Sequence, residues 1–117
     1  MNEPRARELV ARERARVESM LAELGEILAE GSVGRQQPGD REDAGSARET
    51  ESVTVAVTAD LREQLAAVGR AEERIARGTY GRSIESGISI PDERLEAEPL
   101  AERTVEEQRQ HERHWPR

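Results

Sequence analysis

The sequence predicts a mainly α-helical protein built around a long antiparallel coiled-coil hairpin of two helices. Apolar residues recur at heptad spacing in two long segments, and a glycine-rich polar stretch separates these segments. Charged residues make up 37% of the chain and aromatic residues only 2%, which is too few large side chains for a sizeable globular core but typical of long solvated helices. The 117 residues are expected to form one domain.

The first helix of the hairpin is expected over about residues 3–30. Asn2 can cap it, and Pro4 falls in the first turn, where its missing N–H costs little. Gly31 is the expected end. The apolar residues of the expected seam follow mostly in steps of four and three, with Met20 and Ile27 alongside: Val10, Val17, Leu21, Leu24 and Leu28.

Residues 31–45, GSVGRQQPGDREDAG, have no apolar period and are expected to form the turn at the tip of the hairpin. Ser46 and Glu49 match a capping box and predict a second helix over about residues 46–77, with a start a few residues earlier, at Asp43, as the alternative. The alternating β-branched residues of 53–57 are also a strand signal, but a lone strand would have no partner, so a helix is favoured. The expected seam of this helix is Val53, Val57, Leu61, Leu65, Val68 and Ile75.

Charge and composition exclude several classes of function. The net charge of −7 argues against direct binding to nucleic acid, which requires a basic face. The chain has no cysteine, so disulfides and thiolate chemistry are absent. No apolar run approaches the ~20 residues of a membrane span, and the N-terminus lacks a secretory signal, so a cytoplasmic protein is expected. No catalytic pair, phosphate-binding loop or metal-ligand cluster is evident, which predicts a protein that is not an enzyme and needs no cofactor.

The residues after the second helix keep a recognisable pattern of glycine, proline and apolar positions: Tyr80, Gly81, Gly87, Ile90, Arg94, Leu95, Ala97, Pro99 and Ala101. Through these positions, the segment 74–108 resembles the DksA/TraR family of four-cysteine zinc-knuckle proteins that bind RNA polymerase. The expected organisation is a helical hairpin over 1–78, a degenerate knuckle over 79–108 and a C-terminal tail over 109–117. A short third helix is expected over 101–114.

At the four positions where the family has zinc-ligating cysteines, this chain has Ser83, Ser86, Thr104 and Glu107. Structural zinc needs four thiolate or imidazole donors, so the knuckle is expected to be metal-free. Packing of aliphatic side chains around Tyr80 is expected to replace the metal. The expected aliphatic residues are Ile84, Ile88, Ile90, Leu95, Leu100 and Val105. His111 and His114 could share a helix face, but no third ligand is evident, which favours a solvated tail.

Family members insert the coiled coil into the secondary channel of RNA polymerase, where an acidic pair at the tip acts near the catalytic centre. Asp40 and Asp43 match this pair by spacing, whereas Gly45 stands where the family has alanine. The resemblance therefore implies a non-catalytic transcription regulator whose partner is RNA polymerase. Two alternatives stay open. Asp40 and Asp43 could serve only as helix-capping residues, and the chain could be a small helical homo-oligomeric protein, such as a homodimer, that has lost polymerase regulation.

Overall fold

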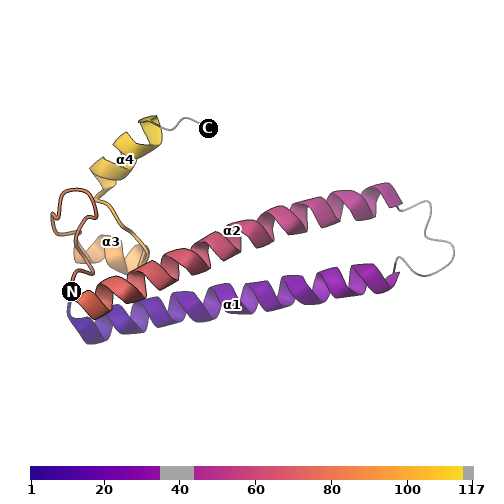
Figure 1. Ribbon diagram of the computed structural model, residues 1–117, viewed down its shortest axis with the longest axis horizontal. Helices are drawn as coiled ribbons and strands as arrows, with labels where there is room; N and C mark the ends of the chain where they lie inside the picture. The colour runs from indigo at the N-terminus through magenta and orange to yellow at the C-terminus, as the bar shows by residue number, and fades with distance from the viewer. Residues whose placement is uncertain (35–43, 115–117) are drawn as a thin grey trace. The chain divides into compact units, whose positions relative to one another are not determined.

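The computed structural model describes residues 1–34 and 44–114, with side chains placed for 1–29 and 51–113. The described residues form four helices, and the mainly α-helical fold class is confirmed (Figure 1). The helices are α1 (Glu3–Gly34), α2 (Ala44–Arg77), α3 (Asp92–Ala97) and α4 (Val105–His114). The described part of the chain has no strand, only a single antiparallel bridge between Arg82 and Ser89. None of the described helices is long and apolar enough to cross a membrane.

α1 continues to Gly34 instead of ending near residue 30, because a glycine within a helix costs only about 1 kcal/mol relative to alanine. α2 begins at Ala44, between the two starts that the sequence allowed, and is helical through residues 53–57, so the strand alternative is excluded. α4 lies within the 101–114 span where a third helix was expected, and it includes part of the segment expected to be a tail.

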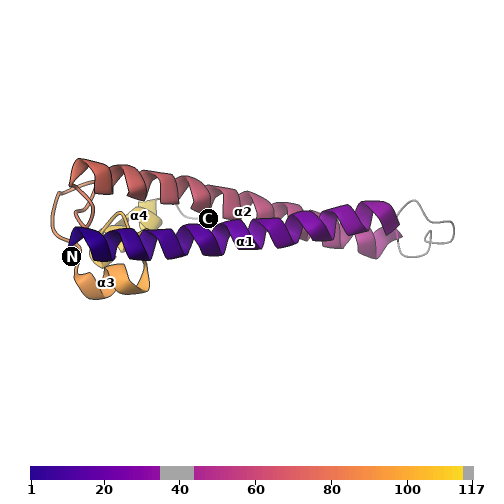
Figure 2. The ribbon, with the colours of Figure 1, turned by 90° about the horizontal axis from the view of Figure 1, so that it is seen from below.

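The chain divides into two compact units: a central unit (Arg14–Ala66) and a terminal unit (Met1–Glu13 with Ala67–Arg117). Within each unit, α1 and α2 lie side by side and antiparallel, as both ribbon views show (Figures 1 and 2). In the central unit, Val17 and Leu61 are buried between the two helices. Partly buried residues continue this seam at heptad spacing: Leu21, Leu24, Leu28, Thr58 and Leu65.

The predicted seam of α2 was wrong at its first two positions. Val53 and Val57 are 64% and 39% exposed, whereas Thr54 is only 7% exposed. Counting back from Leu61 in steps of three and four gives Thr58 and Thr54, not Val57 and Val53. The Thr58 hydroxyl donates a hydrogen bond to the Thr54 carbonyl oxygen at 2.7 Å, so a polar side chain is accommodated in the seam without an unsatisfied donor.

The terminal unit contains the main apolar cluster of the described residues. It comprises Ala6 and Val10 of α1 with Val68, Ala71 and Ile75 of α2, and Tyr80 and Leu100 pack against it. The Tyr80 hydroxyl donates a hydrogen bond to the Pro99 carbonyl oxygen at 2.8 Å. Burial raises the pKa of Tyr80 above its ordinary value. Tyr80 therefore ties the residues after α3 to the end of the helical pair.

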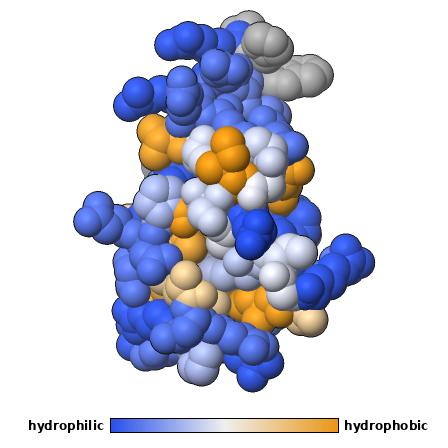
Figure 3. Space-filling view, turned by 90° about the vertical axis from the view of Figure 1, so that its left-hand side faces the viewer, coloured by the Kyte–Doolittle hydropathy of each residue, from blue (hydrophilic) through white to orange (hydrophobic). Residues whose placement is uncertain are grey.

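Only half of the aliphatic residues that were expected to pack in place of zinc are buried or partly buried in the terminal unit. Ile90 and Leu95 are buried, and Leu100 is partly buried. Ile84, Ile88 and Val105 are 50%, 61% and 45% exposed, so their predicted packing around Tyr80 was wrong. Figure 3 shows apolar patches, in orange, on the face of the terminal unit that faces the viewer. The inward position in this loop is taken by Ser83, which is 5% exposed.

Candidate functional site

Ser83 organises a tight turn after α2. Its Oγ accepts hydrogen bonds from the backbone N–H groups of Glu85 and Ser86, at 3.1 and 3.2 Å. Its backbone N–H donates to the Ile88 carbonyl oxygen at 2.8 Å, and its own carbonyl oxygen accepts from the Gly87 N–H at 3.0 Å. Gly87 has φ of +74°, a conformation that glycine adopts without the steric cost a side chain would add. The turn is thus closed by short-range hydrogen bonds within residues 83–88.

Thr104 and Glu107 form a reciprocal cap at the start of α4. The Thr104 N–H donates to the Glu107 carboxylate at 3.0 Å, and the Glu107 N–H donates to the Thr104 Oγ1 at 3.2 Å. This is a capping box, in which each residue satisfies a backbone donor that the first helical turn would leave free. The pattern Thr-x-x-Glu was visible in the sequence and predicts this helix start.

The Ser83 turn and the α4 cap meet at the Glu107 carboxylate. The Thr104 backbone N–H donates a hydrogen bond to it. This hydrogen bond foremost, together with the nearby hydroxyls of Ser83, Ser86 and Thr104, lowers the pKa of Glu107 to about 2. A backbone hydrogen bond from the Ile84 N–H to the Glu102 carbonyl oxygen, at 2.9 Å, joins the same two segments. The four predicted ligand positions are therefore brought together by the fold.

The donor set at these positions does not fit zinc. Three of the four side chains are hydroxyls, which stay protonated at neutral pH, and zinc prefers thiolate, imidazole or several carboxylate donors. The one carboxylate already accepts a hydrogen bond from the Thr104 backbone N–H, at 3.0 Å. Among the residues the structure describes, no group of three or more His, Cys, Asp or Glu side chains could hold a metal ion. His111 lies on α4, and the side chain of His114 is outside the described set.

Charged pairs that the sequence did not reveal surround this cluster. The Glu102 carboxylate accepts hydrogen bonds from Arg70 and Arg74 of α2, with the Arg74 contact at 3.1 Å. Nη2 of Arg74 is buried and has no hydrogen-bond partner. Arg103 pairs with Glu85 at 2.7 Å. These contacts join residues far apart in the sequence, and no spacing rule predicts them.

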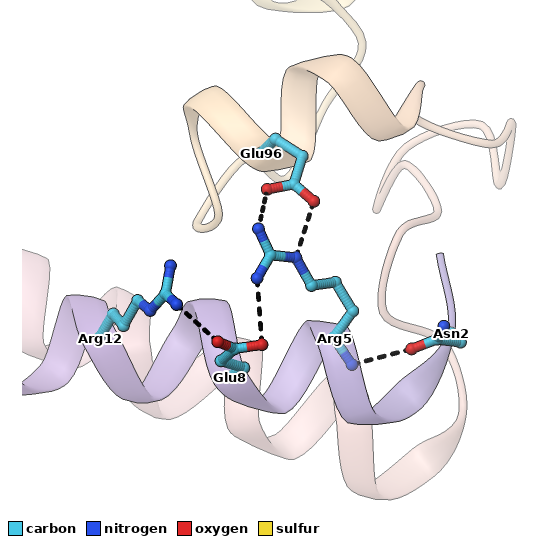
Figure 4. A network of polar contacts seen from close by, with 5 residues as sticks. All are labelled: Asn2, Arg5, Glu8, Arg12 and Glu96. Atoms are coloured by element: carbon cyan, nitrogen blue, oxygen red, sulfur yellow. Dashed lines mark hydrogen bonds and ion pairs between the residues drawn. The ribbon is translucent and has the colours of Figure 1, made fainter.

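A further charged network links α1 to α3. The Arg5 guanidinium donates two hydrogen bonds to Glu96, and it also contacts Glu8 at 3.0 Å (Figure 4). Glu8 accepts a second contact from Arg12, and the Asn2 Oδ1 accepts the Arg5 backbone N–H at 2.8 Å as a helix cap. The predicted capping role of Asn2 is confirmed. The network fixes α3, and with it Leu95, against the first turns of α1.

The predicted acidic tip lies outside the described residues. α1 ends at Gly34 and α2 begins at Ala44, so Asp40 and Asp43 belong to the intervening stretch. Their role stays a prediction, as does the alternative that they only cap α2.

Comparison with known proteins shows a DksA-like fold. The sequence matches no protein-family model and no curated protein. The structure is similar to that of the transcription factor DksA2 from Pseudomonas aeruginosa, with a TM-score of 0.83 and 25% sequence identity. The similarity covers 96% of this chain and 84% of the other. Because nearly the whole chain is covered, the helical pair and the segment after it both contribute to the match, and the chain has the fold of a DksA-like transcription factor.

Proposed function

We propose that this protein is a non-catalytic transcription regulator that binds RNA polymerase through the α1–α2 hairpin and presents Asp40 and Asp43 to the secondary channel. The observation that carries the proposal is the similarity to DksA2 over 96% of the chain. Two long helices joined by an acidic stretch suit this role, because a narrow helical pair can enter a pore. Carboxylates at its end then alter the field around a metal-centred site without reacting.

The residues that line a surface pocket of the terminal unit support a binding role rather than catalysis. The terminal unit has a shallow surface pocket of about 330 Å³ beside Ala6, Ile75 and Tyr80. Its charged lining residues Glu3 and Arg77 are paired within their own helices, with Arg7 and Glu73. No nucleophile beside a base lines this pocket, so a reaction on a bound substrate finds no machinery there.

A transcription assay with tip variants tests the proposal. The full chain is added to RNA polymerase on a promoter template, and Asp40→Asn with Asp43→Asn is compared with wild type. Glu23→Gln with Glu26→Gln is the matched control, because it removes the same charge from exposed positions of α1. The proposal predicts that the tip variant loses the effect on transcript yield and that the control keeps it. If both variants changed the transcript yield equally, a specific role of Asp40 and Asp43 in transcription would be excluded.

A second candidate function, self-association, is favoured by one exposed apolar stripe in the central unit. The stripe comprises Met20 and Ile27 of α1, which are 39% and 49% exposed, and Val53 and Val57 of α2. Each lies one residue before a seam position, which puts all four on the same side of an antiparallel pair. Arg16 and Gln64 occupy equivalent positions, and their hydrogen bond at 2.9 Å across the seam confirms this geometry.

Sedimentation at high micromolar concentration separates this candidate from a monomeric regulator. If a second copy covers the stripe, Val53→Glu shifts the dimer to monomer. Val55→Glu leaves the dimer intact, because residue 55 is also exposed but lies about 200° further round α2. A wild-type chain that sediments as a monomer would rule out self-association through this face.

A further inference from the structure

Residues 99–103, in the connection between α3 and α4, cover part of the main apolar cluster of the terminal unit. Leu100 packs against this cluster, and so does Tyr80. The buried Pro99 accepts the hydrogen bond of the Tyr80 hydroxyl through its carbonyl oxygen, at 2.8 Å. The connecting segment therefore shields apolar side chains of α1 and α2 from water. The cluster residues are Ala6, Val10, Val68, Ala71 and Ile75.

Glu102 fastens this segment to α2. Its carboxylate accepts hydrogen bonds from Nε and Nη2 of Arg70, at 3.3 and 3.1 Å, and from Nη1 of Arg74, at 3.1 Å. The side chains of Glu102 and Arg74 are only 18% and 13% exposed, whereas that of Arg70 is 51% exposed. Breaking a mostly buried ion pair by removing one partner is strongly destabilising, because the remaining charge is left without compensation. The contact between Glu102 and Arg74 is therefore the more important of the two.

The same two residues also hold the loop after α2 and the helix α3. The carbonyl oxygen of Glu102 accepts the Ile84 N–H at 2.9 Å. The carbonyl oxygen of Arg103 accepts Nε of Arg94, on α3, at 3.0 Å. The Arg103 side chain pairs with Glu85 at 2.7 Å. Polar contacts from three separate elements thus converge on two consecutive residues of the segment.

We propose that residues 99–103 form a lid over the apolar cluster, held closed by the ion pair of Glu102 with Arg74, and that the lid opens locally while α1 and α2 stay folded. The two helices still contact each other through the apolar cluster when the lid is open. Opening then exposes the side of this cluster that Leu100 and Tyr80 cover.

Arg74 makes the closed lid less stable than a fully satisfied contact would be. Two arginines share one carboxylate, and Nη2 of Arg74 is buried without a hydrogen-bond partner among the described residues. A buried donor without an acceptor costs free energy. This cost disappears in the open state, where Nη2 meets water. The free-energy gap between the closed and the open lid is therefore smaller than the number of contacts suggests.

Amide hydrogen exchange on the full chain tests the proposal. Glu102→Gln removes the counter-charge of Arg74 and should speed exchange of the Ile84 amide about a hundredfold, because this amide is hydrogen-bonded to the lid. The Val68 amide, within α2, should keep its rate, since the helical pair stays folded. An equal acceleration at Val68 would show that the whole unit unfolds and would overturn the lid.

Glu98→Gln is the matched control, because it removes the same charge just before the lid. The Glu98 side chain is 65% exposed and pairs with Arg94 at 3.4 Å, and exposed pairs of this kind contribute little. The control should leave exchange of the Ile84 amide unchanged. If Glu98→Gln accelerated this amide as much as Glu102→Gln, Glu102 would not be what holds the lid closed.

A paired replacement separates the loss of the ion pair from general damage to the fold. Glu102→Met alone should open the lid as Glu102→Gln does. In the double variant Glu102→Met with Arg74→Met, no mostly buried charge is left alone, and the half-exposed Arg70 is solvated. Exchange of the Ile84 amide should then return to within about threefold of the wild-type rate. A double variant that exchanges as fast as Glu102→Met would contradict the proposed role of the pair.

Discussion

Arg5 of α1 and Glu96 of α3 form a two-pronged ion pair in which Nε and Nη2 of the arginine donate to the two carboxylate oxygens at 2.8 and 2.6 Å. The partners are 91 residues apart in the sequence. Hydrogen bonds from Arg5 lower the pKa of Glu96 below its ordinary value. Parallel double contacts of this kind fix orientation as well as distance, so Glu96 holds α3 in one pose against α1.

Loss of the Arg5 side chain should loosen α3 without unfolding the chain. Arg5→Ala is expected to speed hydrogen exchange at the Leu95 and Glu98 amides, which donate to Pro91 and Arg94 within the α3 turn. Arg7→Ala is the matched control, because the ion pair of Arg7 with Glu3 lies within α1. The difference between the two variants should shrink at high salt, since exposed ion pairs are screened. Equal exchange in both variants would contradict the role of the pair.

Leu95 should contribute more to stability than any other aliphatic residue after α2, because it is fully buried. Leu95→Ala is expected to lower the free energy of unfolding by about 2–5 kcal/mol through lost contacts and the cavity it leaves. Ile88→Ala, at a position 61% exposed, should change it by less than about 0.5 kcal/mol. Denaturant unfolding of both variants checks the order, and a reversed order would be incompatible with the packing described.

Gly81 should resist replacement because of its backbone conformation. Its φ is +87°, and an added Cβ would lie 3.5 Å from Leu95 Cδ1, so the strain comes from the backbone rather than from a clash. Gly81→Ala is expected to destabilise the chain by roughly 1–2 kcal/mol. Gly69→Ala, in the interior of α2 with open space around it, should stabilise the chain by about 0.5–1 kcal/mol. Thermal unfolding of the two variants measures both changes in stability. A stability change of the same sign in Gly81→Ala and Gly69→Ala would contradict the backbone strain expected at Gly81.

The cap formed by Thr104 and Glu107 should weaken in acid. The folded-state pKa of Glu107, about 2, lies below the ordinary value of 4.5, so the ionised carboxylate stabilises the fold fully above about pH 4.5. This contribution falls as the pH drops from 4.5 toward 2. The difference in melting temperature between wild type and Glu107→Gln should therefore be greatest near neutral pH and should vanish near pH 2. A difference that does not change with pH would show that the charge of Glu107 is not what stabilises the cap.

The sequence predicted the two long helices well, because heptad spacing and caps are local signals. It predicted Val53 and Val57 as seam residues of α2, whereas the seam lies one residue later, because threonine was not counted as a seam residue. The structure shows that Thr58 fits there because its hydroxyl donates a hydrogen bond to the Thr54 carbonyl oxygen within the same helix.

The candidate site was predicted only in part. The frame around Tyr80 singled out four positions, and two of them, Thr104 and Glu107, form the cap of α4. The sequence could not show how the Ser83 turn lies beside this cap, because that depends on how two turns dock. The outward orientation of Ile84 and Ile88 and the arginine partners of Glu102 follow from the same docking.

Binding of the full chain to core RNA polymerase tests the central claim most directly. A titration of labelled protein against purified polymerase should show saturable binding of one copy per enzyme. In a second variant, a short glycine linker replaces the residues between α1 and α2, and both helices are kept. This variant should still bind the polymerase but should have no effect on transcription. No saturable binding at concentrations where the chain is folded would contradict a DksA-like role in transcription.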